Sequence, residues 1–315
     1  MIRKTAKHYS ARGQLLIRVL SFSSVVIICN TVIAAPNQAS ATLLPAPHFM
    51  AVDAAGNRDA TSSTDKAVAT EPLTKIRVAL YKGPGTGGEG PPNLKKYLNS
   101  PPETSITEVS PEEIQHGILK YFDVVIFAGG SGSKEAEAIG EIGRSNVIQF
   151  VSNGGGYVGI CAGAYLATSG YPWSLHLLNV KTVSPKWQRG RSTLKLELTA
   201  RGREILGRTE TNLNVIYHNG PVVKEAGLDT LPPFEPLAYF RTEVASNNTP
   251  VGVMINSPAI IAAPFKKGRV VFVSPHPEQT KDLDGIIPHA VLWVAPKDQA
   301  RLKNTTLDKN ITKAE

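Results

Sequence analysis

One cysteine, Cys161, lies in a stretch that has almost no side chains. The sequence GGGYVGICAGAYLA (residues 154–167) contains five glycines and three alanines. Small residues two positions before and after the cysteine give the pattern of a strand-to-helix nucleophile turn. Such a turn would place the thiol at a helix N-terminus, which favours the thiolate, and the Ala162 N–H near a developing oxyanion. A buried structural cysteine at a strand end is the alternative interpretation.

A histidine and a glutamate later in the chain could complete the chemistry. The stretch VVFVSPHPEQ (270–279) is expected to be a strand followed by His276 and Glu278. His276 can take the thiol proton, and Glu278 can hold the imidazole in the required tautomer. Taken alone, the pair also fits a surface histidine before a helix whose first turn carries an acid. Together with the turn at Cys161, the catalytic interpretation is favoured.

Two other pairs of residues follow apolar strands. Gly129-Gly130 comes directly after the apolar run 122–128, and a backbone amide there could supply a second oxyanion donor. The alternative is a plain turn. His218-Asn219 follows another apolar run and could line a pocket, although a turn fits equally well.

Apolar runs alternate with helical patterns through the middle of the chain. We expect helices at 93–99, at 134–154, from residue 162 and at 280–294. In the helix 134–154, Ala138, Ile142, Val147 and Phe150 are expected near one face. We expect strands at 76–81, 122–128, 156–160, 177–183, 192–198, 213–218, 236–243, 259–265 and 269–274.

This alternation predicts an α/β layer fold with a mainly parallel sheet in one domain. The strand-rich region 177–265 is expected to add antiparallel strands to one side. Ligands of such sheets bind at the carboxyl ends of the strands, where Gly129-Gly130, Cys161 and His276 all fall. Their common position is stronger evidence for a site than any one motif.

The N-terminal region has the order of a secretory signal peptide. A basic segment reaches Arg18, an apolar run follows, and small residues come next. An uncleaved membrane anchor is the alternative. Cleavage would remove Cys29 and leave Cys161 as the one thiol. The expected organisation is a leader over 1–41, a disordered linker over 42–73, the domain over 74–296 and a polar tail over 297–315.

Charge and motif spacing argue against several functions. The net charge of +8 includes five basic residues before residue 41, and the remainder holds 29 basic and 26 acidic residues. Nucleic-acid binding is therefore not expected. The histidines outside the candidate site lack metal-ligand spacing, so no metal or other cofactor is expected. The loop GPGTGGEG (83–90) lacks the Lys-Ser/Thr ending of a phosphate-binding loop.

A local basic run lies between the expected strands of the middle region. It could attract an acidic ligand, but a solvated hairpin is the favoured interpretation. Its members are Lys181, Lys186, Arg189, Arg191 and Lys195.

The cysteine turn, the glycine pair and the late His-Pro-Glu together resemble the class I glutamine amidotransferase-like superfamily. Within it, GGGYVGICAGAYLA and YHNGP (217–221) are most similar to the N-terminal domain of biotin-protein ligases. The resemblance covers about residues 75–295. It implies a flavodoxin-like three-layer α/β sandwich, a Cys161–His276–Glu278 triad, and oxyanion donors at Ala162 and around Gly129-Gly130.

Two departures limit what the resemblance implies. Glutaminases of this superfamily carry glutamine four residues after the nucleophile, and this chain has Tyr165 there. Only about 20 residues follow the domain, so we do not expect a biotin ligase. Tyr165, His218 and Asn219 are candidate substrate-binding residues.

Two hypotheses follow. The first is an exported cysteine hydrolase or amidotransferase-like enzyme that cleaves an amide-type bond in a small molecule or peptide. The second is an inactive ligand-binding or regulatory module with the same fold. A membrane is expected as a partner only through an uncleaved leader, and the sequence does not fix the oligomeric state.

Overall fold

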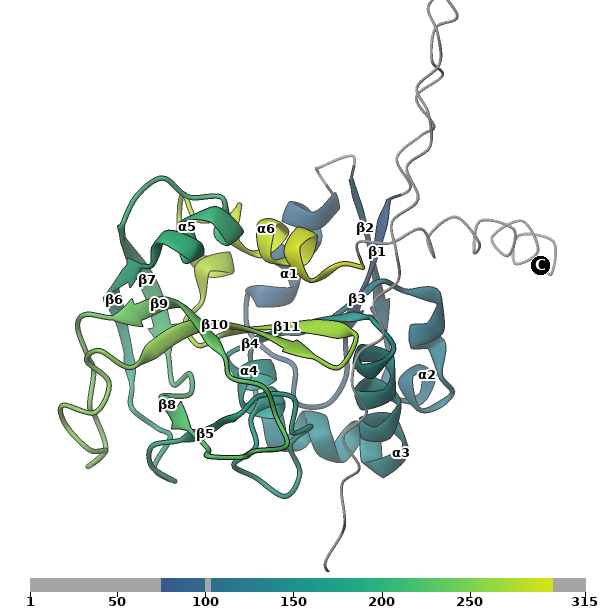
Figure 1. Cartoon of the computed structure of the whole chain (residues 1–315), viewed down its shortest axis with the longest axis horizontal. Coiled ribbons are helices and arrows are strands. Elements are labelled where there is room, and N and C mark those ends of the chain that lie inside the picture. The colour runs from purple at the N-terminus through teal and green to yellow at the C-terminus, as the bar shows by residue number, and fades with distance from the viewer. Residues whose placement is uncertain (1–74, 100–102, 297–315) are drawn as a thin grey trace, which may run out of the picture. The chain divides into compact units, whose positions relative to one another are not determined.

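A nine-stranded sheet organises the part of the chain that the structure describes (Figure 1). The computed structural model describes residues 75–99 and 103–296. The expected leader, linker and polar tail lie outside these residues. No helix within the described residues has the length and apolar character needed to cross a membrane.

Five neighbouring strands of the sheet are parallel. They are β1 (Ile76–Tyr81), β2 (Thr104–Val109), β3 (Val124–Phe127), β4 (Gly156–Ile160) and β11 (Gly268–Val273). They lie in the order β2-β1-β3-β4-β11, which is the strand order of flavodoxin-like folds. All residues of β3 and β4 are buried, because helices cover both faces of a parallel sheet.

Antiparallel strands extend the sheet beyond β11, as the sequence predicts for its middle region. They are β10 (Pro258–Phe265), β9 (Glu235–Phe240), β6 (Arg191–Leu198) and β7 (Asn212–His218). Along β7, Leu213, Val215 and Tyr217 are buried and alternate with exposed residues, because one face of the strand meets solvent. The short strands β5 (Val180–Thr182) and β8 (Val223–Glu225) form a separate antiparallel pair.

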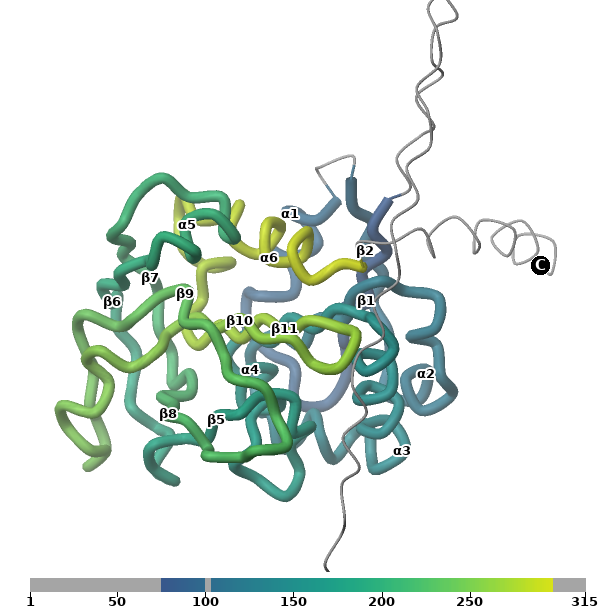
Figure 2. The backbone as a smooth tube through the Cα atoms, viewed as in Figure 1, coloured from purple at the N-terminus to yellow at the C-terminus, as the bar shows by residue number. Residues whose placement is uncertain are grey.

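Helices cover the sheet on both faces and make the three layers of the predicted sandwich (Figure 1). Figure 2 shows α1 and α6 lying together on one side, although they come from opposite ends of the described sequence. Each face of the sheet buries its own apolar cluster. The first face carries α1 (Gly90–Asn99), α5 (Ala200–Leu206) and α6 (Ile286–Val294), and the second α2 (Pro111–Gln115), α3 (Gly132–Ser152) and α4 (Ala162–Ala167).

The predicted buried face of the long helix is confirmed at Val147, and at Phe150, which packs against the core, but it is wrong at Ile142. Ile142 is 65% exposed, whereas Glu135, Ile139, Gly143, Val147 and Val151 are buried. Gly140 has φ 64° and ψ −172°, which interrupts α3 and changes the direction that later side chains face. A helical wheel drawn through residues 134–154 therefore assigns Ile142 to the core although its side chain is exposed.

The predicted last helix begins too early. Residues 280–285 form turns, with Asp282 at φ 64°, and α6 starts only at Ile286. A short 3-10 helix, η2 (Pro277–Gln279), follows His276 instead. A second one, η1 (Ile118–Tyr121), precedes β3.

Several elements have sequence signals that the apolar pattern does not reveal. Ser110 and Glu113 form a capping box at the start of α2. Thr199 caps α5, and Gly207 ends it in the left-handed conformation. The edge strand β2 is polar and half-buried, so it lacks the continuous apolar run of its neighbours.

Candidate active site

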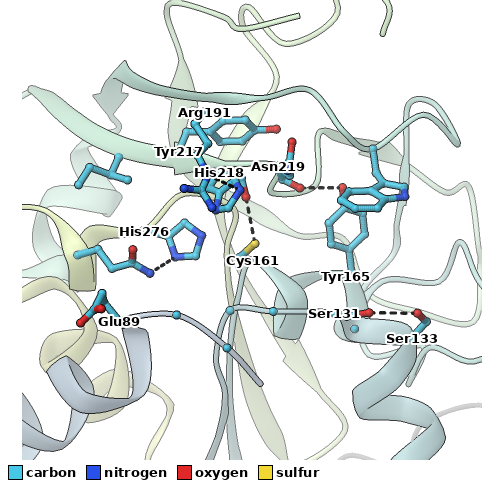
Figure 3. Close-up of a pocket in the computed structure, with 18 of the residues that line it drawn as sticks. Glu89, Ser131, Ser133, Cys161, Tyr165, Arg191, Tyr217, His218, Asn219 and His276 are labelled. Carbon is cyan, nitrogen blue, oxygen red and sulfur yellow. Dashed lines mark hydrogen bonds between the residues drawn. The ribbon is translucent and has the colours of Figure 1, made fainter. Parts of the chain in front are cut away.

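Cys161 lies between β4 and α4, in the strained turn that the sequence predicts (Figure 3). Its φ is 51° and its ψ is −95°, a conformation that non-glycine residues adopt only where the surroundings enforce it. A Cβ on Gly163 would lie 2.6 Å from the Cβ of Phe127, and one on Gly159 would meet the backbone of Gly163. The two glycines are therefore needed for the close approach of strand and helix.

His276 and Glu278 form a buried pair at the carboxyl end of β11. The His276 Nδ1 lies 2.8 Å from Glu278 Oε1, and Glu278 is fully buried. The Gln279 amide lies 3.1 Å from the same oxygen. Gln279 also lies 3.1 Å from Nδ1, but it cannot donate there while Nδ1–H donates to Glu278. Because Nδ1 is paired with Glu278, Nε2 is the imidazole nitrogen that is free to exchange a proton.

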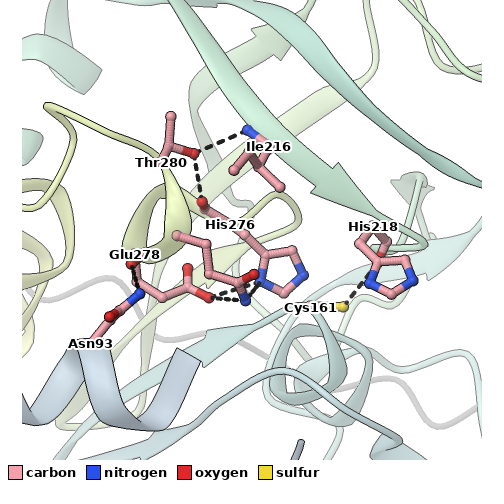
Figure 4. Close-up of polar contacts among 8 residues, drawn as sticks. Asn93, Cys161, Ile216, His218, His276, Glu278 and Thr280 are labelled. Carbon is pink, nitrogen blue, oxygen red and sulfur yellow. Dashed lines mark hydrogen bonds and ion pairs between the residues drawn. The ribbon is translucent and has the colours of Figure 1, made fainter. Parts of the chain in front are cut away.

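The backbone around the histidine is held by neighbouring elements. The His276 N–H donates to the Ile216 carbonyl at 2.7 Å. The Thr280 hydroxyl donates to the His276 carbonyl at 2.7 Å and accepts from the Ile216 N–H at 3.0 Å (Figure 4). The Asn93 side chain of α1 donates to the Glu278 carbonyl at 2.9 Å. No motif in the sequence points to Thr280 or Asn93, because their contacts join elements that are distant in the chain.

The Cys161 thiol and the His276 imidazole line the same cleft, but no hydrogen bond joins them in this structure. The Cys161 thiol donates to the His218 carbonyl at 3.4 Å, and His276 Nε2 has no hydrogen-bond partner among the described residues. Burial by itself lowers the pKa of His276. Interactions with Cys161 and Glu278 outweigh it and raise the pKa to about 10. The part due to Cys161 requires a thiolate close to the imidazole, which the thiol that donates to the His218 carbonyl does not supply, whereas the part due to Glu278 stands on the 2.8 Å contact.

Gly129 and Gly130 lie at the carboxyl end of β3 and beside the imidazole. A Cβ on Gly129 would lie 2.8 Å from His276 Cε1, and one on Gly130 would overlap the Gly85 carbonyl. The Gly129 carbonyl accepts from the Gly87 N–H at 2.9 Å, and the Ser131 N–H donates to the Gly85 carbonyl at 2.7 Å. The glycine-rich loop after β1 is thus hydrogen-bonded to this segment.

Ala162 is the first residue of α4, so its N–H has no preceding helical turn to bind. Its side chain is buried. The Gly163 N–H donates to the Ala128 carbonyl at 3.2 Å, which ties the start of α4 to the end of β3. The predicted oxyanion segments are therefore brought next to each other by adjacent strands.

A cleft of about 980 Å³ opens over these groups. Cys161, His276, Gly129 and Gly130 line it, and so do the predicted binding residues Tyr165, His218 and Asn219. One wall is aromatic: the Tyr171 and Trp173 rings stack with centroids 4.7 Å apart, and Tyr165 lies 6.2 Å from Tyr171. The Tyr165 hydroxyl donates to the Asn219 carbonyl at 3.1 Å. Glu278 and Ala162 are not among the lining residues.

The basic run is exposed at Lys181, Lys186, Arg191 and Lys195, as expected, but it does not form a hairpin, and Arg189 is buried. Arg189 is 2% exposed and lies 3.5 Å from the Glu243 carboxylate, and Arg191 lines the cleft. Both roles depend on the fold around β6, so composition could not indicate them. The described residues contain no group of His, Cys, Asp and Glu arranged to hold a metal ion.

The strand order, the cysteine turn and the cleft at the carboxyl ends of the strands define a class I glutamine amidotransferase-like α/β protein. Residues 76–303 match the family model described as the N-terminal region of biotin-protein ligase. The chain belongs to this family, which confirms the resemblance seen in the sequence.

Solved structures share the fold at low sequence identity. PurLQS from Thermotoga maritima is 13% identical, with a TM-score of 0.51, and the match covers 70% of this chain and 99% of that chain. A protein described as ThuA-like from Bacteroides uniformis is 16% identical, with a TM-score of 0.50, over 73% of this chain and 95% of that chain. None of the curated proteins compared with the chain matches it significantly.

Proposed function

We propose that this protein is a cysteine-dependent enzyme that cleaves an amide-type bond through Cys161, His276 and Glu278. The observation that carries the proposal is the state of His276. Its Nδ1 is held by a buried carboxylate, its Nε2 has no partner among the described residues, and it lines the same cleft as Cys161. A buried polar atom without a partner costs free energy and calls for an explanation, and a catalytic role is one.

The proposed reaction proceeds through a thioester. The Cys161 thiolate attacks the amide carbon, and backbone N–H groups of Ala162 and of the Gly129-Gly130 segment stabilise the oxyanion. The protonated His276 gives its proton to the leaving nitrogen as the C–N bond breaks. Water then attacks the thioester, His276 takes a proton from that water, and the thiolate leaves.

Glutamine is not the substrate that we propose. Tyr165 stands where glutaminases of this superfamily carry glutamine, and its hydroxyl is hydrogen-bonded to the Asn219 carbonyl. This aromatic side chain lines the cleft. The substrate is therefore expected to be another small-molecule or peptide amide.

One observation favours an inactive binding module as the second candidate. The thiol donates to the His218 carbonyl and not to His276. In an active enzyme the thiol would have to turn toward the imidazole when substrate binds, whereas a binding module needs no such change. The two candidates differ in whether Cys161 and His276 act as an ion pair.

The reactivity of Cys161 toward iodoacetamide as a function of pH tests the proposal. In the full chain, we expect alkylation of Cys161 to continue at a pH at which glutathione reacts only slowly, because a neighbouring imidazolium favours the thiolate. His276→Ala should slow alkylation at that pH toward the rate of glutathione, because the positive charge is lost. The extent of alkylation is read by mass spectrometry of the peptide that contains Cys161, which separates it from Cys29.

Arg203→Ala serves as the control, because it removes a cation from α5 at a site that does not line the cleft. It should leave the pH dependence of Cys161 alkylation unchanged. A pH dependence like that of glutathione in both wild type and His276→Ala would contradict the enzymatic proposal and favour the binding module.

A further inference from the structure

Arg191 stands over the nucleophile as the first residue of β6. In the antiparallel register it pairs with His218 of β7, and both side chains line the cleft near Cys161 (Figure 3). The Arg191 Nε donates to His218 Nε2 at 2.6 Å. This bond fixes the orientation of the guanidinium plane.

The backbone beneath Arg191 is held on both sides. The Gly190 N–H donates to the Asn219 side-chain oxygen at 2.7 Å, and the Asn219 N–H donates to the Gly190 carbonyl at 3.1 Å. Asn219 adopts the left-handed conformation at φ 56°, which asparagine tolerates better than most residues. The reciprocal bonds set the position of Arg191 relative to His218 before any ligand binds.

The outer edge of the guanidinium is free for a ligand. Among the described residues, Arg191 Nη1 and Nη2 have no hydrogen-bond or ion-pair partner, since Nε alone is used by His218. These two nitrogens are parallel donors with the spacing of the two carboxylate oxygens. Lysine in this place would offer only a point charge.

The charges that line the cleft favour an anion near Arg191. His218 is neutral, because its Nε2 accepts the hydrogen bond from Arg191. Burial, and to a smaller extent the nearby Arg191 and His276 cations, lower the pKa of His218. Glu89 is the one acidic side chain lining the cleft in the described part of the chain, and Figure 3 shows it on the other side of Cys161. Glu278 is buried behind His276 and engaged with it.

We propose that Arg191 binds a carboxylate of the substrate, so that this cleft selects amides that carry a negative charge. The inference rests on the proposed function, because it assigns the substrate class of the same cleft. It concerns binding and not the thiol chemistry, and the two can be tested separately.

Two alkylating reagents of nearly equal size provide the test. The Cys161 sulfur attacks the CH2 carbon of iodoacetate or iodoacetamide, the C–S bond forms and iodide leaves. Iodoacetate carries a carboxylate, and iodoacetamide is neutral. The ratio of their rate constants reports the preference for the anion, because the fraction of thiolate is the same for both reagents and cancels.

The experiment uses the full chain at pH 9, where an ordinary thiol also reacts, and follows the Cys161 peptide by mass spectrometry. We expect the ratio of the iodoacetate to the iodoacetamide rate to exceed that of glutathione. Arg191→Gln should lower it about 3–5-fold, the range expected for a partly exposed charge pair. Arg191→Lys should keep part of the preference, because its charge remains.

Lys195→Gln is the matched control. Lys195 lies on the same strand, is exposed and does not line the cleft, so its removal changes the net charge equally and should leave the ratio within about 1.5-fold. A ratio in Arg191→Gln that equals the wild-type ratio would overturn the inference. A lower ratio in Arg191→Gln, together with a wild-type pH dependence of alkylation like that of glutathione, would support the carboxylate site and reject the catalytic proposal.

Discussion

The hydrogen bond between His276 Nδ1 and Glu278 Oε1 decides which imidazole nitrogen faces the cleft. Because the carboxylate is fully buried, water does not compete for it, and the bond persists in the folded state. The raised pKa of His276 depends on this carboxylate and on Cys161. In the proposed reaction, this raised pKa favours the imidazolium, the form that can protonate a leaving group.

Glu278→Gln should lower the pKa of His276 from its value of about 10. Glutamine keeps the shape but removes the negative charge that favours the imidazolium, so the proton leaves at a lower pH. Nitrogen-15 NMR of the imidazole in a pH titration measures the change. Glu225→Gln, on an exposed position of β8, is the control and should leave the titration in place. An unchanged His276 pKa in Glu278→Gln would mean that the carboxylate does not set its charge.

At the scale of elements, short connections between strands and helices position the site. The glycine pair, Cys161 and His276 lie at one edge of the sheet, because they follow the carboxyl ends of the neighbouring parallel strands β3, β4 and β11. The antiparallel strands β6 and β7 add Arg191 and His218 from the side. The helix α3 begins two residues after Gly130, so the way α3 packs against the sheet also affects the position of Gly130 in the cleft.

Gly140→Ala should destabilise the protein by about 1–3 kcal/mol, because φ 64° and ψ −172° is a region that only glycine occupies readily. Ser145→Ala, at an exposed position of the same helix, should change the free energy of unfolding by less than about 0.5 kcal/mol. Urea unfolding followed by circular dichroism compares the two. Equal stability of Gly140→Ala and wild type would show that α3 can run straight without cost.

At the scale of the whole described unit, one continuous sheet connects the parallel and antiparallel strands. The pairing of β11 with β10 joins the two parts, and the apolar cluster on one face includes residues from both. The cleft depends on both parts as well, since Cys161 comes from one and Arg191 from the other. A site built across such a junction requires that both parts fold together.

Leu80→Ala on β1 and Leu196→Ala on β6 should each lower the free energy of unfolding by about 2–5 kcal/mol, because both side chains are fully buried. Since the sheet is continuous, each variant should still unfold in one transition, with tryptophan fluorescence and circular dichroism changing together. Two separate transitions in Leu196→Ala would mean that the antiparallel strands fold as an independent unit.

The sequence predicts most of the sheet because its strands are continuous apolar runs. The predicted limits of 76–81 and 156–160 agree with β1 and β4, and the other predicted strands overlap observed ones. Helices were harder to predict. The glycine in α3 and the left-handed Asp282 before α6 alter helices locally, and apolar spacing does not register such backbone changes.

By itself, the sequence determined the α/β class, the turn at Cys161 and the candidate residues at three strand ends, because these depend on local composition and spacing. Only the tertiary structure decided that Arg191 faces His218, that the thiol meets the His218 carbonyl, and that Glu278 is buried behind His276. These contacts join residues that are distant in the chain, or they depend on which side chains are buried. They follow from strand register and packing, which local patterns do not specify.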